Sequence, residues 1–472
     1  MSGEDLCYLT ATAARERFVA RTLSPVELLD ALIARSEAVE PKINAFGDRY
    51  FDEARAQAKA AEARYMGRGA APRPLEGIPV ALKDVARLKG KRTTQGSLTL
   101  KDTVETVSDP MVERLLDAGA IIHARTNVPE FCLSGVCRSR LYGTTRNPHN
   151  LDYGPGGSSG GSGASLAAGT STLATGTDIG GSIRIPAAVC GLYGYKPPHG
   201  RNPEAFPANL DPFNHCGPLA RSVADAALFQ NIVSGAHPRD LDSLRDRVVV
   251  DPGLKSLKGK HIAYSFDLGY MQVDAEVRRN MQAMLDGLKA QGAQVEEVDL
   301  GWTGDVERLG LAWWNSLHFG RVTVWQADKN PELLCDYTLK FAEFVRKTTL
   351  DDTCRALEMV DRMYQTFGPM MERFDAFLCP MATIPGIKAE HDPYDPDFRI
   401  NGVKVDGEYG WVASHQFNML NKCPAMSAPS GIAANGMPTS VQIVGRTYDD
   451  QSVFTIAAAA EQVAPFRRPK GL

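Results

Sequence analysis

The sequence between residues 154 and 163 reads Gly-Pro-Gly-Gly-Ser-Ser-Gly-Gly-Ser-Gly. Six of these ten residues are glycine, a composition that would suit a flexible linker. Both flanks are strongly patterned, however, so we interpret the stretch as a structured loop. A phosphate-binding loop would need a lysine after its glycines, and the stretch has none. A dinucleotide-binding fingerprint would follow a strand, but the turn-like segment 147–150 precedes it.

One further motif overlaps this loop. Residues 156–160 match the pattern G-x-S-x-G of a nucleophile elbow, which lies on a sharp strand-to-helix turn. Here Pro148, Asn150 and Pro155 precede the motif and are poor strand residues. An α/β-hydrolase would also need a histidine that follows an acidic residue, and no later histidine has a distinguishing context. We therefore disfavour this interpretation.

Strands and helices are predicted to alternate on both sides of the loop. Apolar runs predict buried strands, and apolar residues on one face of a periodic segment predict helices. Ser24-Pro25-Val26-Glu27 is a capping box, and Pro41 is expected to end its helix. We expect strands over 77–82, 120–124, 261–265, 376–379 and 439–444, and helices over 24–40, 51–66, 111–118, 222–234, 277–291 and 452–463. This alternation predicts the α/β class.

Composition excludes several classes of protein. The chain has 472 residues and a net charge of −4, without basic blocks, so we expect no dedicated binding of nucleic acid. Its nine cysteines are scattered and form no CxxC, which argues against a disulfide framework and a zinc site. The first residues have no apolar run, and the longest uncharged stretch, 153–177, is rich in Gly, Ser and Thr. We therefore expect no membrane segment and a cytoplasmic location.

Three polar residues could together perform nucleophilic chemistry. Lys83 ends a predicted buried strand, Ser158 lies in the Gly/Ser loop, and Ser182 follows two glycines. A serine needs a base to attack an amide carbonyl. A lysine can be that base only when burial lowers its pKa, and a second serine can pass the proton. Two glycines before a nucleophile also let successive amides point inward, where they could stabilise an oxyanion.

Seven sequence segments together form a specific pattern. They are GIPVALKDV, ARTNVPEF, GTTRNPHN, GPGGSSGGSGASLAAG, ATGTDIGGSIRIPAAVCGLYGYKP, GPLARSVADAAL and PTSVQIVGR. On these segments the chain resembles the amidase signature family, densely from about residue 75 to 235 and more thinly from 375 to 465. Ser182 follows Ser158 by 24 residues, and Ser158 follows Lys83 by 75, as in members of this family.

This resemblance implies a Ser-cisSer-Lys triad. Ser182 would be the acyl-enzyme nucleophile, Ser158 a bridging serine held by a cis peptide, and Lys83 the base. The backbone amides of Ile179, Gly180, Gly181 and Ser182 would form the oxyanion hole. Thr177, Asp178 and Arg184 would surround the triad, with Asp178 and Arg184 paired to brace the loop, although this pair could be purely structural.

The resemblance also implies one large α/β/α domain, residues 1–472, around a mixed twisted sheet, with a catalytic segment of about 75–235. The implied activity is hydrolysis of a carboxylic amide without metal or cofactor, with an ester or a carbamate as further substrates. Two alternatives are the glutaminase-type A subunit of a tRNA-dependent amidotransferase and a non-enzymatic binding protein. The intact triad argues against the latter. A homodimer is common among relatives.

The substrate pocket is expected to come from divergent loops. The regions of about 300–340, read as an inserted helical layer, and 386–411, read as a lid or rim, are the candidates. Cys132, Trp314 and His199 are candidate substrate contacts; His199 could instead be a surface change, and Cys132 and Trp314 could be core residues. Cys190 is expected to be buried. With no charged residue anchored to the site, we expect a small apolar or aromatic acyl group.

Overall fold

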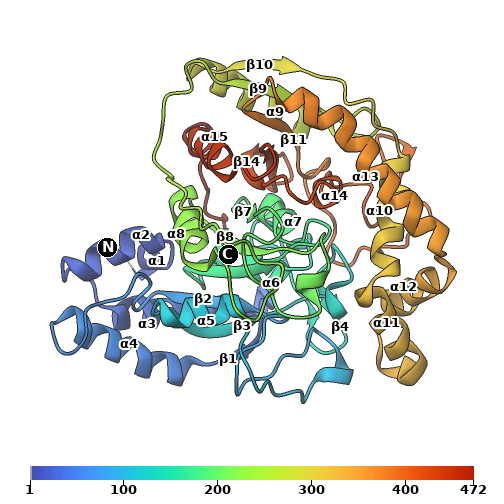
Figure 1. Ribbon diagram of the computed structural model, residues 1–472. Helices are drawn as coiled ribbons and strands as arrows, with labels where there is room; N and C mark the ends of the chain where they lie inside the picture. Colours follow the sequence, from blue (N-terminus) through green and yellow to red (C-terminus); the bar gives the residue numbers. More distant parts are fainter. Residues whose placement is uncertain (1–2) are drawn as a thin grey trace.

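The computed structural model describes residues 3–472 and centres on one mixed sheet of eleven strands (Figure 1). In spatial order the strands are β1 (Phe46–Arg49), β3 (Ile121–Thr126), β2 (Pro79–Lys83), β6 (Leu173–Thr177), β8 (Cys216–Ala220), β7 (Tyr193–Lys196), β14 (Ala425–Ile432), β15 (Pro438–Val444), β11 (Ala376–Pro380), β9 (His261–Tyr264) and β10 (Gln294–Glu297). β2 runs parallel to β3 and β6, and β9 parallel to β10 and β11, whereas the remaining pairs are antiparallel. The prediction of an α/β fold around a mixed sheet is confirmed.

Helices cover both faces of the sheet because successive strand residues point to opposite sides. On β2, Val80 and Leu82 enter one apolar core and Ala81 enters another. The first core includes residues of α1 (Gly3–Cys7), α2 (Ala11–Val19), α5 (Pro110–Asp117), α8 (Val223–Val233), α9 (Ala275–Ala290) and α15 (Asp450–Val463). The second includes residues of α6 (Gly160–Ala168) and α7 (Arg184–Val189). The result is the predicted α/β/α arrangement.

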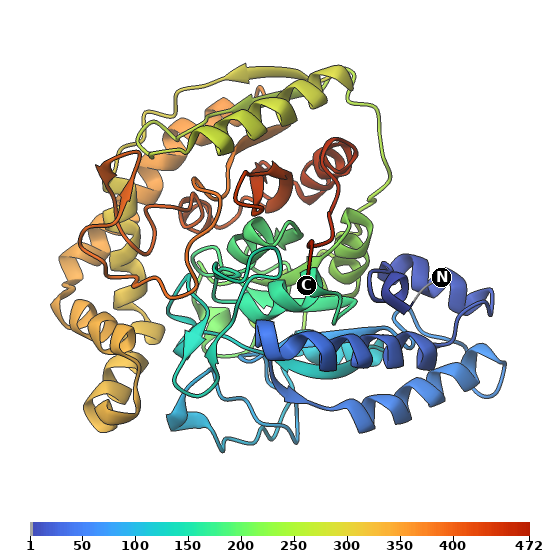
Figure 2. The ribbon, with the colours of Figure 1, turned by 180° about the vertical axis from the view of Figure 1, so that it is seen from behind.

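Further helices pack around these layers. α3 (Pro25–Ile43) and α4 (Phe51–Tyr65) pack on each other near the β1 edge. An outer layer of helices stands beside the sheet (Figure 2) and consists of α10 (Asp305–Ser316), α11 (His318–Lys329), α12 (Asp336–Lys347) and α13 (Leu350–Met371). A separate apolar core joins α10, α13 and α14 (Gln416–Met419) to β11. The predicted helical layer over 300–340 corresponds to α10 and α11.

One predicted helix boundary is wrong. Pro41 does not end its helix: α3 continues to Ile43, and Pro41 lies within its last turn. In the last turn, the proline removes only one backbone hydrogen bond of the helix, close to the residue at which the helix ends. Asn44 ends the helix in a left-handed conformation, φ 49°. The capping box at Ser24 and Glu27 is present as predicted.

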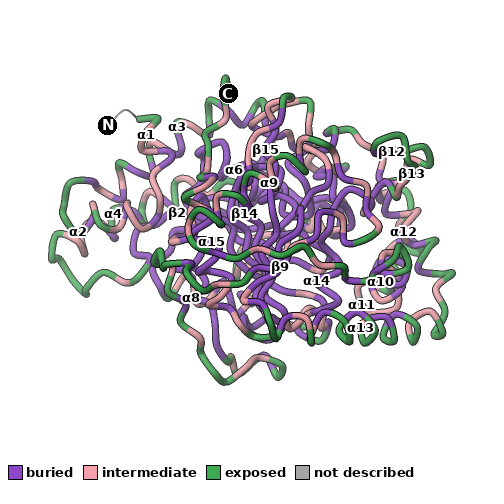
Figure 3. The backbone as a smooth tube through the Cα atoms, turned by 90° about the horizontal axis from the view of Figure 1, so that it is seen from above, coloured by how far each residue is buried: buried purple, intermediate pink, exposed green. Residues whose placement is uncertain are grey.

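The Gly/Ser loop lies in the middle of the molecule. Residues 154–204 are buried except for half-buried Thr177 and Ile179, and buried backbone fills the centre of the molecule in Figure 3. The second half of the loop begins α6 at Gly160. A side chain at Gly161 would collide with the backbone of Asn127. The glycines therefore allow close packing, and a linker is excluded.

Candidate active site

Strand β2 brings Lys83 into the interior. The Lys83 backbone N–H donates to Oγ1 of Thr175 on the neighbouring strand β6, 2.9 Å away. The side chain is fully buried, and its Nζ lies 2.7 Å from both Ser158 Oγ and Thr177 Oγ1. Burial lowers the pKa of Lys83, although nearby Cys132 and Asp178 act in the opposite direction. A lysine in this environment loses its proton more easily than one in water.

A cis peptide bond joins Gly157 to Ser158. A side chain at Gly157 would collide with the carbonyl oxygen of Ser134, so the residue before Ser158 has no room for a Cβ. The next residue, Ser159, donates its backbone N–H to the carbonyl oxygen of Ser182 at 3.3 Å. This bond holds the Gly/Ser loop directly against the loop that carries Ser182.

Asp178 organises the loop over residues 178–184. Its carboxylate accepts from the backbone N–H of Gly181 at 2.8 Å and from the Arg184 side chain at 2.8 and 2.9 Å. Burial alone would raise the pKa of Asp178, but the Arg184 charge and hydrogen bonds from Arg184 and Asn418 hold it well below its usual range. Arg184 also donates to the carbonyl of Ser414, to Asn418 Oδ1 and to Gln442 Oε1. The buried pair thereby connects the loop to the C-terminal part of the chain.

The loop presents three unpaired backbone amides. Among the described residues, the N–H groups of Ile179, Gly180 and Ser182 have no hydrogen-bond partner, whereas that of Gly181 donates to Asp178. Of the four amides expected to form an oxyanion hole, that of Gly181 is therefore the one with a hydrogen-bond acceptor inside the protein. Gly181 has φ 116°, a conformation that favours glycine. A Cβ on Gly180 would lie 2.5 Å from the Trp314 ring, so this residue also lacks room for a side chain.

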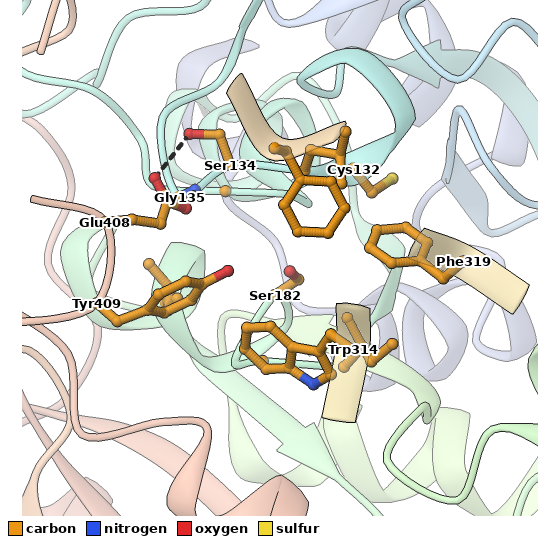
Figure 4. A pocket seen from close by; sticks show the side chains of 14 residues that line it. Cys132, Ser134, Gly135, Ser182, Trp314, Phe319, Glu408 and Tyr409 are labelled. Atoms are coloured by element: carbon orange, nitrogen blue, oxygen red, sulfur yellow. Dashed lines mark hydrogen bonds between the residues drawn. The ribbon is translucent and has the colours of Figure 1, made fainter. Parts of the chain in front are cut away.

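Two cavities meet at these loops. The small cavity, with about 390 Å³ of empty space including solvent at its mouth, contains Ser182 and has walls formed by Leu133, Ser134, Gly135, Gly157, Gly180, Ile185, Trp314, Phe341, Glu408 and Tyr409 (Figure 4). The large cavity, about 1750 Å³ on the same measure, contains Ser158 and Thr177. Its walls include Met111, Phe131, Phe206, Leu210 and Val322. Cys132, Ile179 and Phe319 border both cavities.

The expected substrate contacts separate into two groups. Cys132 and Trp314 face the small cavity, and Phe319 lies beside them (Figure 4). His199 borders neither cavity: it is 4% exposed, and its ring nitrogens face Asp242 Oδ2 at 2.9 Å and the Asn214 carbonyl. His199 is therefore neither at the cavity wall nor on the surface. Cys190 is buried, as predicted.

Glu408 is a site residue that the sequence pattern did not predict. It lies in the region 386–411, after the hairpin of β12 (Arg399–Ile400) and β13 (Val403–Lys404). Its carboxylate accepts from the Gly135 backbone N–H and from Ser134 Oγ at 3.1 Å. Nothing local in the sequence distinguishes this glutamate from surface acids, because only the tertiary fold buries it at the cavity.

Comparison with known proteins identifies the family. The amidase family model matches residues 27–454, which is most of the chain. The chain belongs to the amidase signature family. It is an amidase, a hydrolase that acts on C–N bonds, as its acylamidase relatives also indicate.

Several relatives of this amidase are similar over their full length. It is 31% identical to an acylamidase of Rhodococcus erythropolis, covering 100% of this chain and 98% of that protein. It is also 31% identical to the A subunit of the glutamyl-tRNA(Gln) amidotransferase of Geobacter metallireducens, covering 99% of each. A bacterial aryl acylamidase structure superimposes with a TM-score of 0.89 at 28% identity, covering 97% of this chain and 96% of that one.

Two other kinds of feature are absent from the described part of this amidase. In residues 3–472, no helix combines the length and apolar character needed to cross a membrane. Within the same residues, no group of three or more His, Cys, Asp or Glu side chains is placed to hold a metal ion.

Proposed function

We propose that this amidase hydrolyses carboxylic amides through a Ser182 acyl-enzyme, with Ser158 and Lys83 as the proton relay. The observation that carries the proposal is the fully buried Lys83 Nζ, 2.7 Å from Ser158 Oγ, with the next residue hydrogen-bonded to Ser182. A buried amine with a lowered pKa can accept a proton at neutral pH. A serine between this amine and the nucleophile can transfer that proton.

The reaction then proceeds in two halves. Neutral Lys83 takes a proton from Ser158 as Ser158 takes one from Ser182, whose Oγ attacks the amide carbon. The amides of Ile179, Gly180 and Ser182 stabilise the oxyanion. The intermediate collapses, the C–N bond breaks, and the leaving amine receives the proton back through Ser158. Water then attacks the acyl-enzyme, giving its proton to the same relay and releasing the acid and Ser182.

The two cavities suggest where each half of the substrate lies. Ser182, the acylated residue, faces the small cavity, and Ser158, the proton donor to the amine, faces the large one. The acyl group therefore occupies the small cavity and the leaving amine the large one. The small size and the aromatic walls of Trp314, Phe341 and Tyr409 favour a small acyl group. The large cavity also contains charged side chains such as Arg87, Glu105 and Asp109, but its apolar part suits an aryl amine. An ester or carbamate could use the same acyl-enzyme.

Trapping the acyl-enzyme tests this function. The protein is mixed with 4-nitrophenyl acetate, quenched in acid, and digested for mass spectrometry. We expect an acetyl adduct on the peptide that contains Ser182, and no adduct there in Ser182→Ala. That variant should lose at least about 10⁴-fold in kcat/KM on acetyl-4-nitroanilide, because the nucleophile is gone. Full activity in Ser182→Ala, or an adduct only elsewhere, would reject Ser182 as nucleophile.

A second candidate function is that of a glutamine-hydrolysing A subunit of a tRNA-dependent amidotransferase. It is supported by the full-length similarity to the Geobacter metallireducens protein, which equals that to the acylamidase. A protein of this kind would hydrolyse glutamine and need partner chains for activity. Turnover of anilides by the isolated chain, without release of ammonia from glutamine, would exclude it.

A further inference from the structure

The small cavity contains one acidic side chain among mainly apolar walls. Glu408 is 8% exposed and borders the cavity beside Tyr409, across from Cys132 and Phe319 (Figure 4). The surrounding side chains include Leu133, Ile179, Ile185, Trp314 and Phe341. A carboxyl group in such surroundings is costly to ionise without a compensating partner.

Two hydrogen bonds favour the ionised form of Glu408. The Gly135 N–H points to one carboxylate oxygen and the Ser134 hydroxyl to the other. The Ser134 oxygen itself accepts from the Val136 N–H at 3.0 Å, which leaves its proton directed at Glu408. Each carboxylate oxygen has two acceptor positions, so two positions remain for a donor from the cavity.

No cation of the protein would balance the negative charge of Glu408 in its ionised form. Among residues 3–472, no Lys, Arg or His forms an ion pair with Glu408. The titratable groups that interact electrostatically with Glu408 are Asp406, Tyr394 and Tyr409. None of these three side chains can carry a positive charge. Burial, with a contribution from Asp406, raises the pKa of Glu408 to about 8, against the hydrogen bonds from Gly135 and Ser134. The free protein thus holds a buried carboxyl group that lacks a cationic partner.

We propose that Glu408 selects substrates whose acyl group carries an ammonium group, which forms the missing ion pair in the small cavity. The proposal rests on the proposed function, because it requires the acyl group to lie beside Ser182 in that cavity. It changes the expected substrate from an apolar acyl amide to an amide of a small amino acid. An ammonium group supplies both the positive charge and the donors that the two free acceptor positions can use.

A matched pair of substrates tests the proposal. Alanyl-4-nitroanilide and 2-methylpropanoyl-4-nitroanilide have nearly the same shape, and differ by an ammonium group in place of a methyl group. The α-ammonium has a pKa of about 8, so it is mostly charged at pH 7. Release of 4-nitroaniline gives kcat/KM for each substrate. We expect a ratio of at least about 10 in favour of the alanyl substrate, corresponding to about 1.4 kcal/mol.

Two variants distinguish the effect of the Glu408 charge from the effect of a nearby acidic side chain. Glu408→Gln retains the size and an acceptor but loses the charge, and should lower the alanyl preference at least about 10-fold. Asp406→Asn removes an acid from the same turn and retains the oxygen that accepts from the backbone of Glu408 and Tyr409. It should alter the preference by less than about 3-fold.

The outcomes separate the role of Glu408 from the proposed function. A wild-type preference for the 2-methylpropanoyl substrate overturns the role of Glu408 and needs no variant to be folded. An equal loss on both substrates in Glu408→Gln shows a structural role instead, and also overturns the proposal. If Ser182→Ala cleaves both substrates like the wild type, the proposed function itself is wrong. A second matched pair, β-alanyl-4-nitroanilide and butanoyl-4-nitroanilide, places the ammonium group one carbon further from the amide carbonyl. Comparing the two pairs shows which distance between Ser182 and Glu408 the substrate has to span.

Discussion

The loop that carries Ser182 and the helical layer that faces it are held in different ways. The loop is fixed by charge and hydrogen bonds. Asp178 accepts a hydrogen bond from the Gly181 backbone N–H and forms a fully buried ion pair with Arg184. The helical layer that carries Trp314 is held by side-chain packing. Among the described residues, the ring nitrogens of Trp314 and His415 have no hydrogen-bond partner, and Trp314 contacts Tyr409 and His415 through its ring.

This difference indicates how the two regions tolerate change. Hydrogen-bonded groups in a buried network depend on one another, so the loss of one member leaves others unpaired. Apolar walls tolerate substitutions that conserve volume. The reaction should therefore be sensitive to single changes in the loop, while the choice of acyl group should be adjustable through the wall.

Replacing the buried lysine should produce the largest effect. Lys83→Ala should lower kcat/KM about 10³-fold, about 4 kcal/mol, because the proposed base is lost. In the wild type, kcat/KM should fall as pH decreases through the lowered pKa of Lys83, since a protonated amine cannot accept a proton. A pH series on both proteins measures this dependence. An unchanged pH profile in the variant would remove Lys83 from the relay.

Breaking the ion pair in the loop should come next. Asp178→Asn should lower the free energy of unfolding by about 3 kcal/mol, because Arg184 would keep a buried charge without its partner. Denaturant titration measures this change in the free energy of unfolding. The matched control is Asp305→Asn, which removes a surface ion pair with Arg308 and should change stability by less than about 1 kcal/mol. Equal effects would show that the loop does not depend on this charge.

Two buried histidines extend the comparison to the sheet and to the side chains that contact Trp314. His123 on β3 lies 3.2 Å from the Val80 carbonyl and 3.0 Å from that of Thr170, whereas both His415 nitrogens lack partners among the described residues. His123→Phe should destabilise the protein by about 1–2 kcal/mol through a lost hydrogen bond. His415→Phe should be neutral or stabilising, because it removes unpaired polar atoms. The midpoint of thermal unfolding measures the stability of both variants. A greater loss of stability in His415→Phe than in His123→Phe would contradict this prediction.

The smallest expected effect is a change of specificity. Phe341 and Phe344 lie on the same helix, α12, but only Phe341 borders the small cavity. Phe341→Leu should shift the relative kcat/KM of acetyl and butanoyl anilides about 3-fold, with stability changed by about 1 kcal/mol. Phe344→Leu serves as the control for helix α12. If both variants shift the ratio equally, the cavity wall does not set acyl size.

Short sequence motifs indicate the proposed catalytic residues, whereas no comparable motif indicates the full lining of the pocket. Lys83, Ser158 and Ser182 lie in short motifs whose residue types have a direct chemical reason, and the fold brings Lys83 and Ser158 together. Helix α6 was not predicted because Gly160 and Gly161 are poor helix formers, and close packing overrides that preference. Strand β8, Cys216–Ala220, contains Gly217 and Pro218 and gave no strand signal.

Residues of the pocket depend on contacts between distant segments. His199 was expected at the channel or on the surface, but it is buried against Asp242, 43 residues later. Glu408 is 273 positions from Gly135, which donates to it. No local pattern encodes either contact, since each is created only when separate layers of the fold pack together.

The network around Arg184 also has a consequence for protein synthesis. Its partners Ser414, Asn418 and Gln442 follow it by 230, 234 and 258 residues. A ribosome that adds about 5–20 residues per second makes Lys83, Ser158 and Ser182 many seconds before it makes these partners. The nascent chain therefore contains all three proposed catalytic side chains before the residues that brace the loop of Ser182 exist. Activity should appear only when translation is nearly complete, so unfinished chains should be inactive.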